Sequence, residues 1–133
     1  MRRSHTISLS INRRFDEVYA YLAQPKNYGH WAAVKPGTFK LLPDGDWQGE
    51  MTFGLRHVRF TPPNSFGVLD HAIFVPGREM LYNAMRVVPN EEGAELNFTF
   101  FRREGMDDAQ FDSAVEWITT EFMALKSLLE VGA

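Results

Sequence analysis

The sequence predicts an α+β fold in which a curved antiparallel sheet of about seven strands wraps around one long C-terminal helix. Short runs rich in Phe, Val, Thr and Leu alternate with turn-forming residues over about residues 38–103, which is typical of strands joined by hairpins. After Gly105 the apolar residues recur at steps of three and four, which indicates a single helix. The expected order is one strand, two short helices, six strands and one long helix.

The N-terminal third contains the first strand and both short helices. Between residues 5 and 11, Thr and Ser alternate with larger side chains, which is the period of a half-buried strand. Asn12 is a good N-cap for a helix over about residues 13–23, and Pro25 ends that helix. Pro25 can also open a second short helix, which the Pro-Gly pair at 36–37 terminates. We expect these helices to form a hairpin.

Turn-forming residues bound the six later strands, for example at 43–45 and 62–64. The final helix begins at Asp107 or Asp108, because either carboxylate can cap its first turn, and it runs for about 25 residues. The chain has no repeat, linker or low-complexity segment, so we expect a single domain over residues 1–133. The predicted strands cover about residues 38–42, 47–54, 56–61, 66–75, 80–88 and 95–103.

The composition limits the classes of partner. Lys and Arg number 14 against 17 Asp and Glu, and the net charge of −3 argues against general attraction to nucleic acid. Without cysteine we expect no disulfide, no thiolate metal site and a reducing, cytoplasmic location. No apolar run has the length of a membrane span or a signal peptide. Aromatic residues make up 14% of the chain, and they serve either dense packing or the lining of a ligand cavity.

Three stretches carry a family resemblance: INRRFDEVYAYLAQPKNY at residues 11–28, with Trp31 after it, GVLDH at 67–71 and LKSLLE at 125–130. Together with the order of elements, they resemble the START-like (SRPBCC) helix-grip superfamily, in particular its polyketide cyclase-like branch. Gln24 departs from the Asp that relatives often have before the Pro. The resemblance implies a helix-grip fold but leaves the activity open, because the superfamily includes ligand carriers, cyclases, aromatases, coenzyme Q-binding proteins and chaperone ATPase activators.

The inner face of the sheet holds the candidate site. If three turns are centred near residues 63, 77 and 91, four side chains lie side by side on that face: Arg56, His71, Asn83 and Phe100. Met85 and Phe98 share the face by parity. His71 and Asn83 are then polar groups on an apolar wall, so each needs the other, backbone, water or a ligand as partner. Asp70 points to the opposite face, so we expect no Asp70–His71 dyad.

Other candidates surround the expected gap between the sheet and the long helix, and for each a purely structural role competes. Arg102 and Arg103 are interpreted as keeping a strand end soluble, with attraction of an anionic ligand head as the alternative. The four histidines lack metal-ligand spacing, so we expect no metal and no cofactor. The candidates for the rim are Tyr28, Trp31 and Trp47, and those on the inner stripe of the helix are Phe111, Val115 and Ile118.

These observations favour binding of a small hydrophobic molecule, lipid-, polyketide- or quinone-like, because the fold offers a cavity while the sequence offers no catalytic constellation. The second hypothesis is a polyketide cyclase- or dehydratase-like enzyme. In it His71 acts as general base or oxyanion partner, and Asn83 and Arg56 orient the substrate. The third is a protein-interaction module of the chaperone-activator kind, which needs an exposed groove. Whether the chain forms a homodimer is left open.

Overall fold

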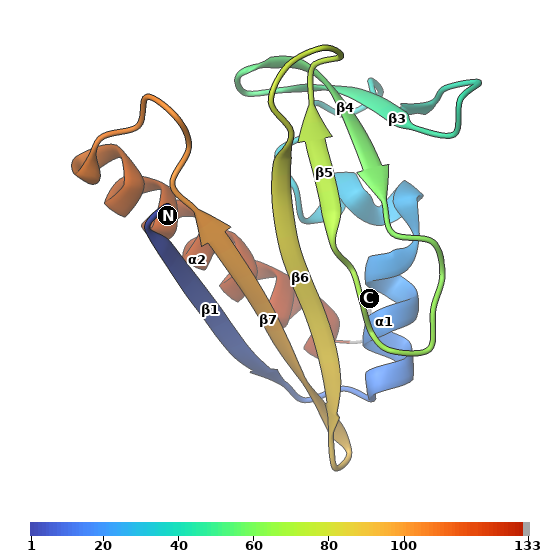
Figure 1. Cartoon of the computed structure of the whole chain (residues 1–133). Helices are drawn as coiled ribbons and strands as arrows, with labels where there is room; N and C mark the ends of the chain where they lie inside the picture. The colour runs from blue at the N-terminus through green and yellow to red at the C-terminus, as the bar shows by residue number, and fades with distance from the viewer. Residues whose placement is uncertain (132–133) are drawn as a thin grey trace.

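The computed structural model of the chain describes residues 1–131. Within them the order of strands and helices is the predicted one, and the α+β helix-grip fold class is confirmed (Figure 1). The elements are β1 (Ser4–Ile11), α1 (Phe15–Ala23), the 3-10 helix η1 (Pro25–His30), β2 (Lys40–Leu41), β3 (Trp47–Met51), β4 (Gly54–Phe60), β5 (His71–Phe74), β6 (Leu81–Asn90), β7 (Gly93–Phe101) and α2 (Asp108–Glu130).

The strands differ most from the sequence prediction around Gly54 and before β5, and the bounds of β2, β6 and β7 differ by one or two residues at their ends. Thr52 and Phe53 form the turn between β3 and β4, so β4 begins at Gly54 instead of following a break there. β5 is much shorter than the predicted 66–75, because Asn64 holds the preceding segment as a loop. Its side-chain oxygen accepts hydrogen bonds from the backbone N–H groups of Phe66 at 3.0 Å and Val68 at 3.1 Å, which is the local bonding that competes with a strand ladder.

The seven strands form one antiparallel sheet in the order β1-β7-β6-β5-β4-β3-β2. β6 joins its two halves, because Leu81 to Asn83 pair with β5 whereas the residues from Ala84 onward pair with β7. Figure 1 shows β3, β4 and β5 turning away from β1 and β7 above this point, with α2 behind the β1–β7 half. The curvature that the prediction requires is therefore concentrated along β6.

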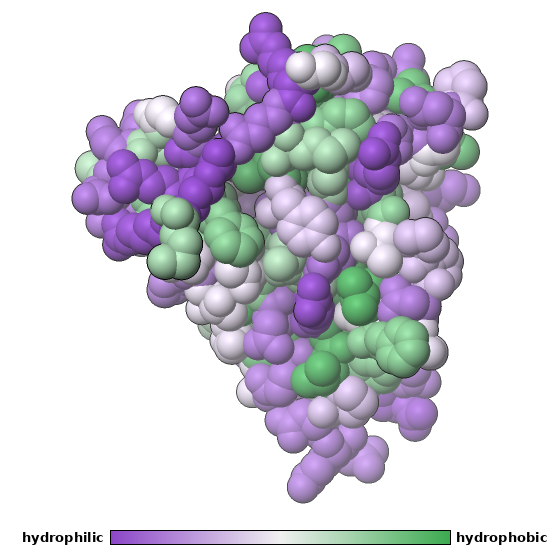
Figure 2. All heavy atoms as spheres, viewed as in Figure 1, coloured by the Kyte–Doolittle hydropathy of each residue, from purple (hydrophilic) through white to green (hydrophobic). Residues whose placement is uncertain are grey.

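The hydrophobic core lies between the inner face of the sheet and the helices. The larger cluster joins β1, β6, β7, α1 and α2, and a smaller one surrounds Tyr28 and Val58. Trp31 packs against both clusters. On the outer face, viewed in Figure 2, hydrophilic side chains gather over the N-terminal arm and the start of α2.

The long helix α2 begins as predicted. Asp107 accepts a hydrogen bond from the Gln110 backbone N–H at 2.8 Å, and the Gln110 side chain accepts one from the Asp107 N–H at 2.9 Å, which is a complete capping box. The residues of α2 that are buried are Phe111, Phe122, Leu125 and Leu129. In residues 1–131, no helix is both long and apolar enough to cross a membrane.

Candidate ligand-binding site

A cavity of about 100 Å³ separates the inner face of the sheet from the middle of α2. Its wall comes from η1 and the residues after it, from β5, β6 and β7, and from α2. Most of the lining is apolar, and Phe53 and Trp117, which are 43% and 53% exposed, reach it from the surface. The polar side chains of this wall include His71, Asn83, Arg103 and Glu121, and the indole N–H of Trp31 adds a further donor.

The structure brings most of the predicted ligand residues to this cavity. Trp31, His71, Asn83, Phe98, Phe100 and Ile118 line it. Met85 lies two positions along β6 from Asn83, on the same face of the sheet, and is fully buried within the larger core cluster. Phe111 is equally buried against Phe100, with ring centroids 5.5 Å apart, and Val115 packs against the same cluster. Tyr28 is a buried part of the wall, and Trp47 stacks on Phe39 outside the cavity.

The predicted strand pairing is correct on one side of His71 and wrong on the other. His71 lies opposite Asn83, as expected. Phe100 lies one position beyond the last β6–β7 pair, Ala84 with Thr99, in the register that places it opposite Asn83. Arg56, however, does not lie opposite His71, because Phe60 takes that place and Arg56 pairs with Gly49.

The cause of the Arg56 error is the loop between β4 and β5. The prediction centred a tight turn near residue 63, but the pair Phe60–His71 places the centre between Ser65 and Phe66. Moving the centre by two residues moves each partner by four, which preserves the face of the sheet and displaces Arg56 along it. Arg56 consequently lines a neighbouring groove instead of the cavity.

His71 is held as a neutral imidazole. Its side chain is 4% exposed and lies against three aromatic rings, those of Tyr28, Trp31 and Phe60, at centroid distances of 5.4, 5.8 and 5.9 Å. Burial lowers the pKa of His71 from 6.5 to about 4. Nδ1 lies 3.1 Å from the Leu69 carbonyl oxygen, to which it donates as N–H, and Nε2 is therefore left as a hydrogen-bond acceptor.

Asp70 accepts a backbone hydrogen bond from β6 next to His71. The Leu69 N–H donates to the Met85 carbonyl at 2.8 Å, so a regular ladder would return a bond from the Met85 N–H to Leu69. That N–H donates instead to Asp70 Oδ1 at 2.7 Å. Burial alone would raise the pKa of Asp70, but hydrogen bonds from Arg86, Tyr82 and Met85 outweigh it and hold the pKa below its usual value.

Two buried N–H groups of residues that line the cavity have no acceptor among residues 1–131. In the part of the chain that the structure describes, the buried side-chain nitrogens without a hydrogen-bond partner are Trp31 Nε1 and Arg103 Nε, and both residues line this cavity. Buried donors are nearly always paired in folded proteins, so two unpaired ones on one wall point to a missing acceptor. Sequence reasoning considered Trp31 only as a rim aromatic.

Glu121 is a cavity residue that the sequence prediction missed. Burial raises its pKa from 4.5 to about 7, so a large fraction carries a proton near neutral pH. Its position one helical turn after Ile118 was the available signal, because residues three apart share a helix face. Among residues 1–131, no three His, Asp or Glu side chains cluster closely enough to hold a metal ion.

Comparison with known proteins supports the fold. No protein-family model and no curated protein sequence matches the chain. Three solved structures with the same architecture are the protein XoxI from Bacillus cereus, the Aha1 dimer from Colwellia psychrerythraea, and Ara h 8.0201. Their TM-scores are 0.74, 0.72 and 0.67 at 13%, 12% and 8% identity, and the matches cover 97%, 98% and 96% of this chain and 96%, 98% and 97% of those chains. The chain therefore shares the helix-grip fold of these structures.

Proposed function

We propose that this chain binds a small, mainly apolar molecule that carries an oxygen acceptor, in the cavity between the sheet and α2. The observation that carries the proposal is the pair of unpaired buried donors, Trp31 Nε1 and Arg103 Nε, on the wall of an apolar cavity. A ligand carbonyl or carboxylate that displaced the side chains covering these nitrogens would satisfy them. Asn83 and the acceptor nitrogen of His71 add further hydrogen-bonding capacity to the same wall.

The size of the cavity limits the part of the ligand that it encloses. An apolar cavity of about 150 Å³ is sufficient for benzene, whereas sites for drug-sized ligands span about 300–1,000 Å³. At about 100 Å³ the cavity is smaller than that benzene site, so it encloses a short branched chain or part of a ring. A lipid-, polyketide- or quinone-like molecule would have to place the rest of its length outside the cavity, past Phe53 and Trp117.

The binding reading is favoured over a polyketide cyclase- or dehydratase-like enzyme. An effective general base has a pKa near the working pH, and burial takes the pKa of His71 to about 4. Arg56, the residue expected to orient a substrate, lies outside the cavity. Likeness to the Aha1 dimer extends to the fold alone, so a chaperone-activator role remains the third hypothesis.

The proposal also treats residues 1–133 as one ligand-binding domain in a reducing, cytoplasmic compartment, in keeping with the absence of cysteine. A measurement of molecular mass in solution tests whether the chain forms a homodimer, since one structure with this fold is a dimer. Native mass spectrometry of protein from its own host would detect a co-purifying apolar molecule.

The test uses two probes of nearly equal shape, acetophenone and ethylbenzene, of which only acetophenone has a carbonyl. The chain has three tryptophans, so an NMR titration follows three indole N–H signals. We expect acetophenone to bind roughly three- to tenfold more tightly than ethylbenzene and to shift the Trp31 indole signal most, because one new hydrogen bond contributes about 0.5–1.5 kcal/mol.

Two variants and one control separate binding from folding. Trp31→Phe should abolish the preference for acetophenone, and His71→Ala should weaken binding by roughly three- to tenfold if its ring contacts the ligand. Trp117→Phe, at the exposed edge of the cavity, serves as the matched control and should keep the preference. Equal affinity for both probes with an unmoved Trp31 signal would contradict the proposal.

A further inference from the structure

A charged groove adjoins the cavity. It has a volume of about 510 Å³, within the range of about 300–1,000 Å³ that is typical of ligand sites. The groove and the cavity share four lining residues: Phe53, Ile73, Leu81 and Arg103. A molecule too long for the cavity would therefore continue into this groove.

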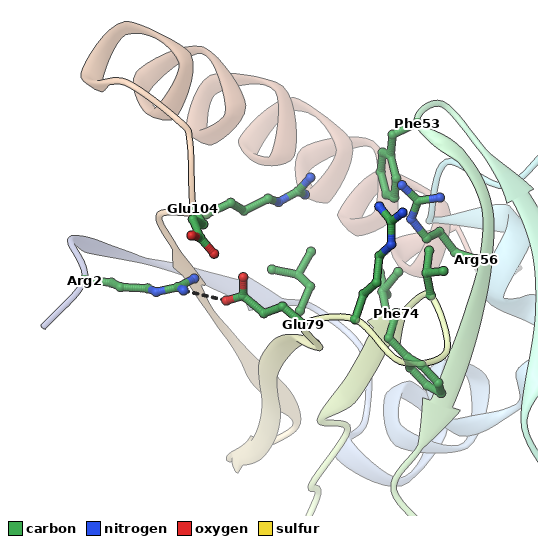
Figure 3. Close-up of a pocket in the computed structure, with 11 residues that line it drawn as sticks. Arg2, Phe53, Arg56, Phe74, Glu79 and Glu104 are labelled. Atoms are coloured by element: carbon green, nitrogen blue, oxygen red, sulfur yellow. Dashed lines mark ion pairs between the residues drawn. The ribbon is translucent and has the colours of Figure 1, made fainter.

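The groove concentrates positive charge in a chain whose net charge is −3. Arginine side chains from four segments line it, against the two carboxylates of Glu79 and Glu104. Arg2 forms an ion pair with Glu79, and Figure 3 shows that pair and Glu104 on one side of the groove, with Phe53 and Arg56 on the other. The four arginines are Arg2, Arg56, Arg78 and Arg103.

Two of these arginines crowd the same aromatic ring. The guanidinium carbons of Arg56 and Arg103 lie 4.8 and 5.2 Å from the centroid of Phe53. Burial, and then the charge of Arg56, lower the pKa of Arg103. Neither makes an ion pair with a carboxylate of residues 1–131, and Arg103 Nε is a buried donor without an acceptor. Two guanidinium groups that lie over one ring and form no ion pair within residues 1–131 leave positive charge that an anion in the groove would neutralise.

We propose that the ligand is an organic acid whose ring lies in the cavity and whose carboxylate lies in the groove between Arg56 and Arg103. This inference rests on the proposed function and specifies the chemistry of its ligand. The anion would supply the acceptor that Arg103 Nε lacks and would relieve the repulsion between the two guanidinium groups. It also makes Arg103 a recognition residue, in place of the solubilising role that its strand-end position suggests.

The experiment compares three probes that differ only in the charge of the head group: 3-phenylpropanoate, 3-phenylpropan-1-ol and 3-phenylpropylamine. Isothermal titration calorimetry should give an affinity for the carboxylate about tenfold above that for the alcohol, with the amine weakest, because charge-assisted hydrogen bonds are about twice as strong as neutral ones. Raising the salt to about 0.5 M NaCl should weaken binding of the carboxylate and leave the alcohol unchanged.

Three charge-matched variants test the location. Arg56→Gln should lower the affinity for the carboxylate by about fivefold and leave the alcohol unaffected. Arg78→Gln changes an exposed loop residue, so it tests the groove without disturbing the core and should give a smaller loss of the same sign. Arg14→Gln removes the same charge beyond the other end of β1 and should change neither affinity.

The outcomes separate this inference from the proposed function. Equal affinities for carboxylate and alcohol, with the Trp31 signal shifted by both, would overturn the organic-acid inference and leave the cavity as the binding site. Unchanged carboxylate affinity in both Arg56→Gln and Arg78→Gln would likewise overturn it. Failure of all three probes to bind would overturn it as well, and the acetophenone comparison would then decide the proposed function.

Discussion

Replacing His71 with asparagine should change how the stability of the protein depends on pH. The asparagine Nδ2 occupies nearly the position of the imidazole Nδ1, so it can still donate to the Leu69 carbonyl, but it does not titrate. The folded state holds the pKa of His71 at about 4, against 6.5 for the unfolded chain. Between these values the unfolded state binds more protons, so the parent loses stability as the pH falls.

The magnitude follows from these two pKa values. At about pH 7.5 the titration of His71 contributes almost nothing to the free energy of unfolding. At about pH 5 it destabilises the parent by about 2 kcal/mol, because the unfolded imidazole is then largely protonated and each pKa unit corresponds to about 1.36 kcal/mol. The stability cost of His71→Asn should therefore be about 2 kcal/mol smaller at pH 5 than at pH 7.5. Taking the difference between the two proteins removes the carboxylates that they share, including Asp70.

Urea unfolding followed by tryptophan fluorescence at several pH values measures this difference. Glu121→Gln gives a check of opposite sign, because burial raises the pKa of Glu121 to about 7 and the folded state then binds more protons than the unfolded state. The parent consequently loses stability through Glu121 as the pH rises from about 4.5 to 7, and the glutamine variant does not. A cost of His71→Asn that stays constant from pH 7.5 to 5 would refute the buried, neutral imidazole.

Three further changes test the scaffold by urea unfolding. Gly67→Ala should lower the free energy of unfolding by at least about 3 kcal/mol, because φ is +72° and a Cβ would lie 2.0 Å from the Val87 carbonyl oxygen. Gly77→Ala, where φ is +80° but the surrounding space is open, should lower it by only about 1–2 kcal/mol. Equal losses in the two variants would contradict the close contact at Gly67. Asp107→Ala should cost about 1 kcal/mol through loss of the capping box, and no loss would mean that the cap is not formed in solution. Ile118→Pro should cost about 3 kcal/mol or more, and melting within a few degrees of the parent would exclude α2 from the core.

Alternation along the strands was sufficient to predict which side chains face α2. His71, Asn83 and Phe98 lie on the inner face as expected, because a one-residue slip would have turned the whole apolar set toward solvent. The pairing of Arg56 was not predictable in the same way. It depends on the length of the loop held by Asn64, and parity does not distinguish one even shift from another.

The size of the cavity, and whether side chains fill it, could not be predicted from the sequence either. Whether aromatic side chains fill the gap under the sheet depends on how sharply β6 bends and on rotamers, neither of which a periodic pattern specifies. Arg103 illustrates the same limit. At the end of a predicted strand it looks like a solubilising charge, but in the structure it lines the cavity, where Phe53, in a turn 50 residues earlier in the chain, lies against it.

The side chains of Asp70 and His71 do not contact each other, but both form hydrogen bonds with the backbone where β5 meets β6. Alternation places them on opposite faces, and Asp70 is held on the outer face by Arg86, 2.9 Å away. The Asp70 carboxylate accepts the Met85 N–H and so holds the segment before β5 against β6, and the Leu69 carbonyl in that segment accepts the N–H of His71 Nδ1. That bond leaves Nε2 as the acceptor nitrogen of a residue that lines the cavity, so the outer-face carboxylate supports the stretch of backbone that selects the tautomer.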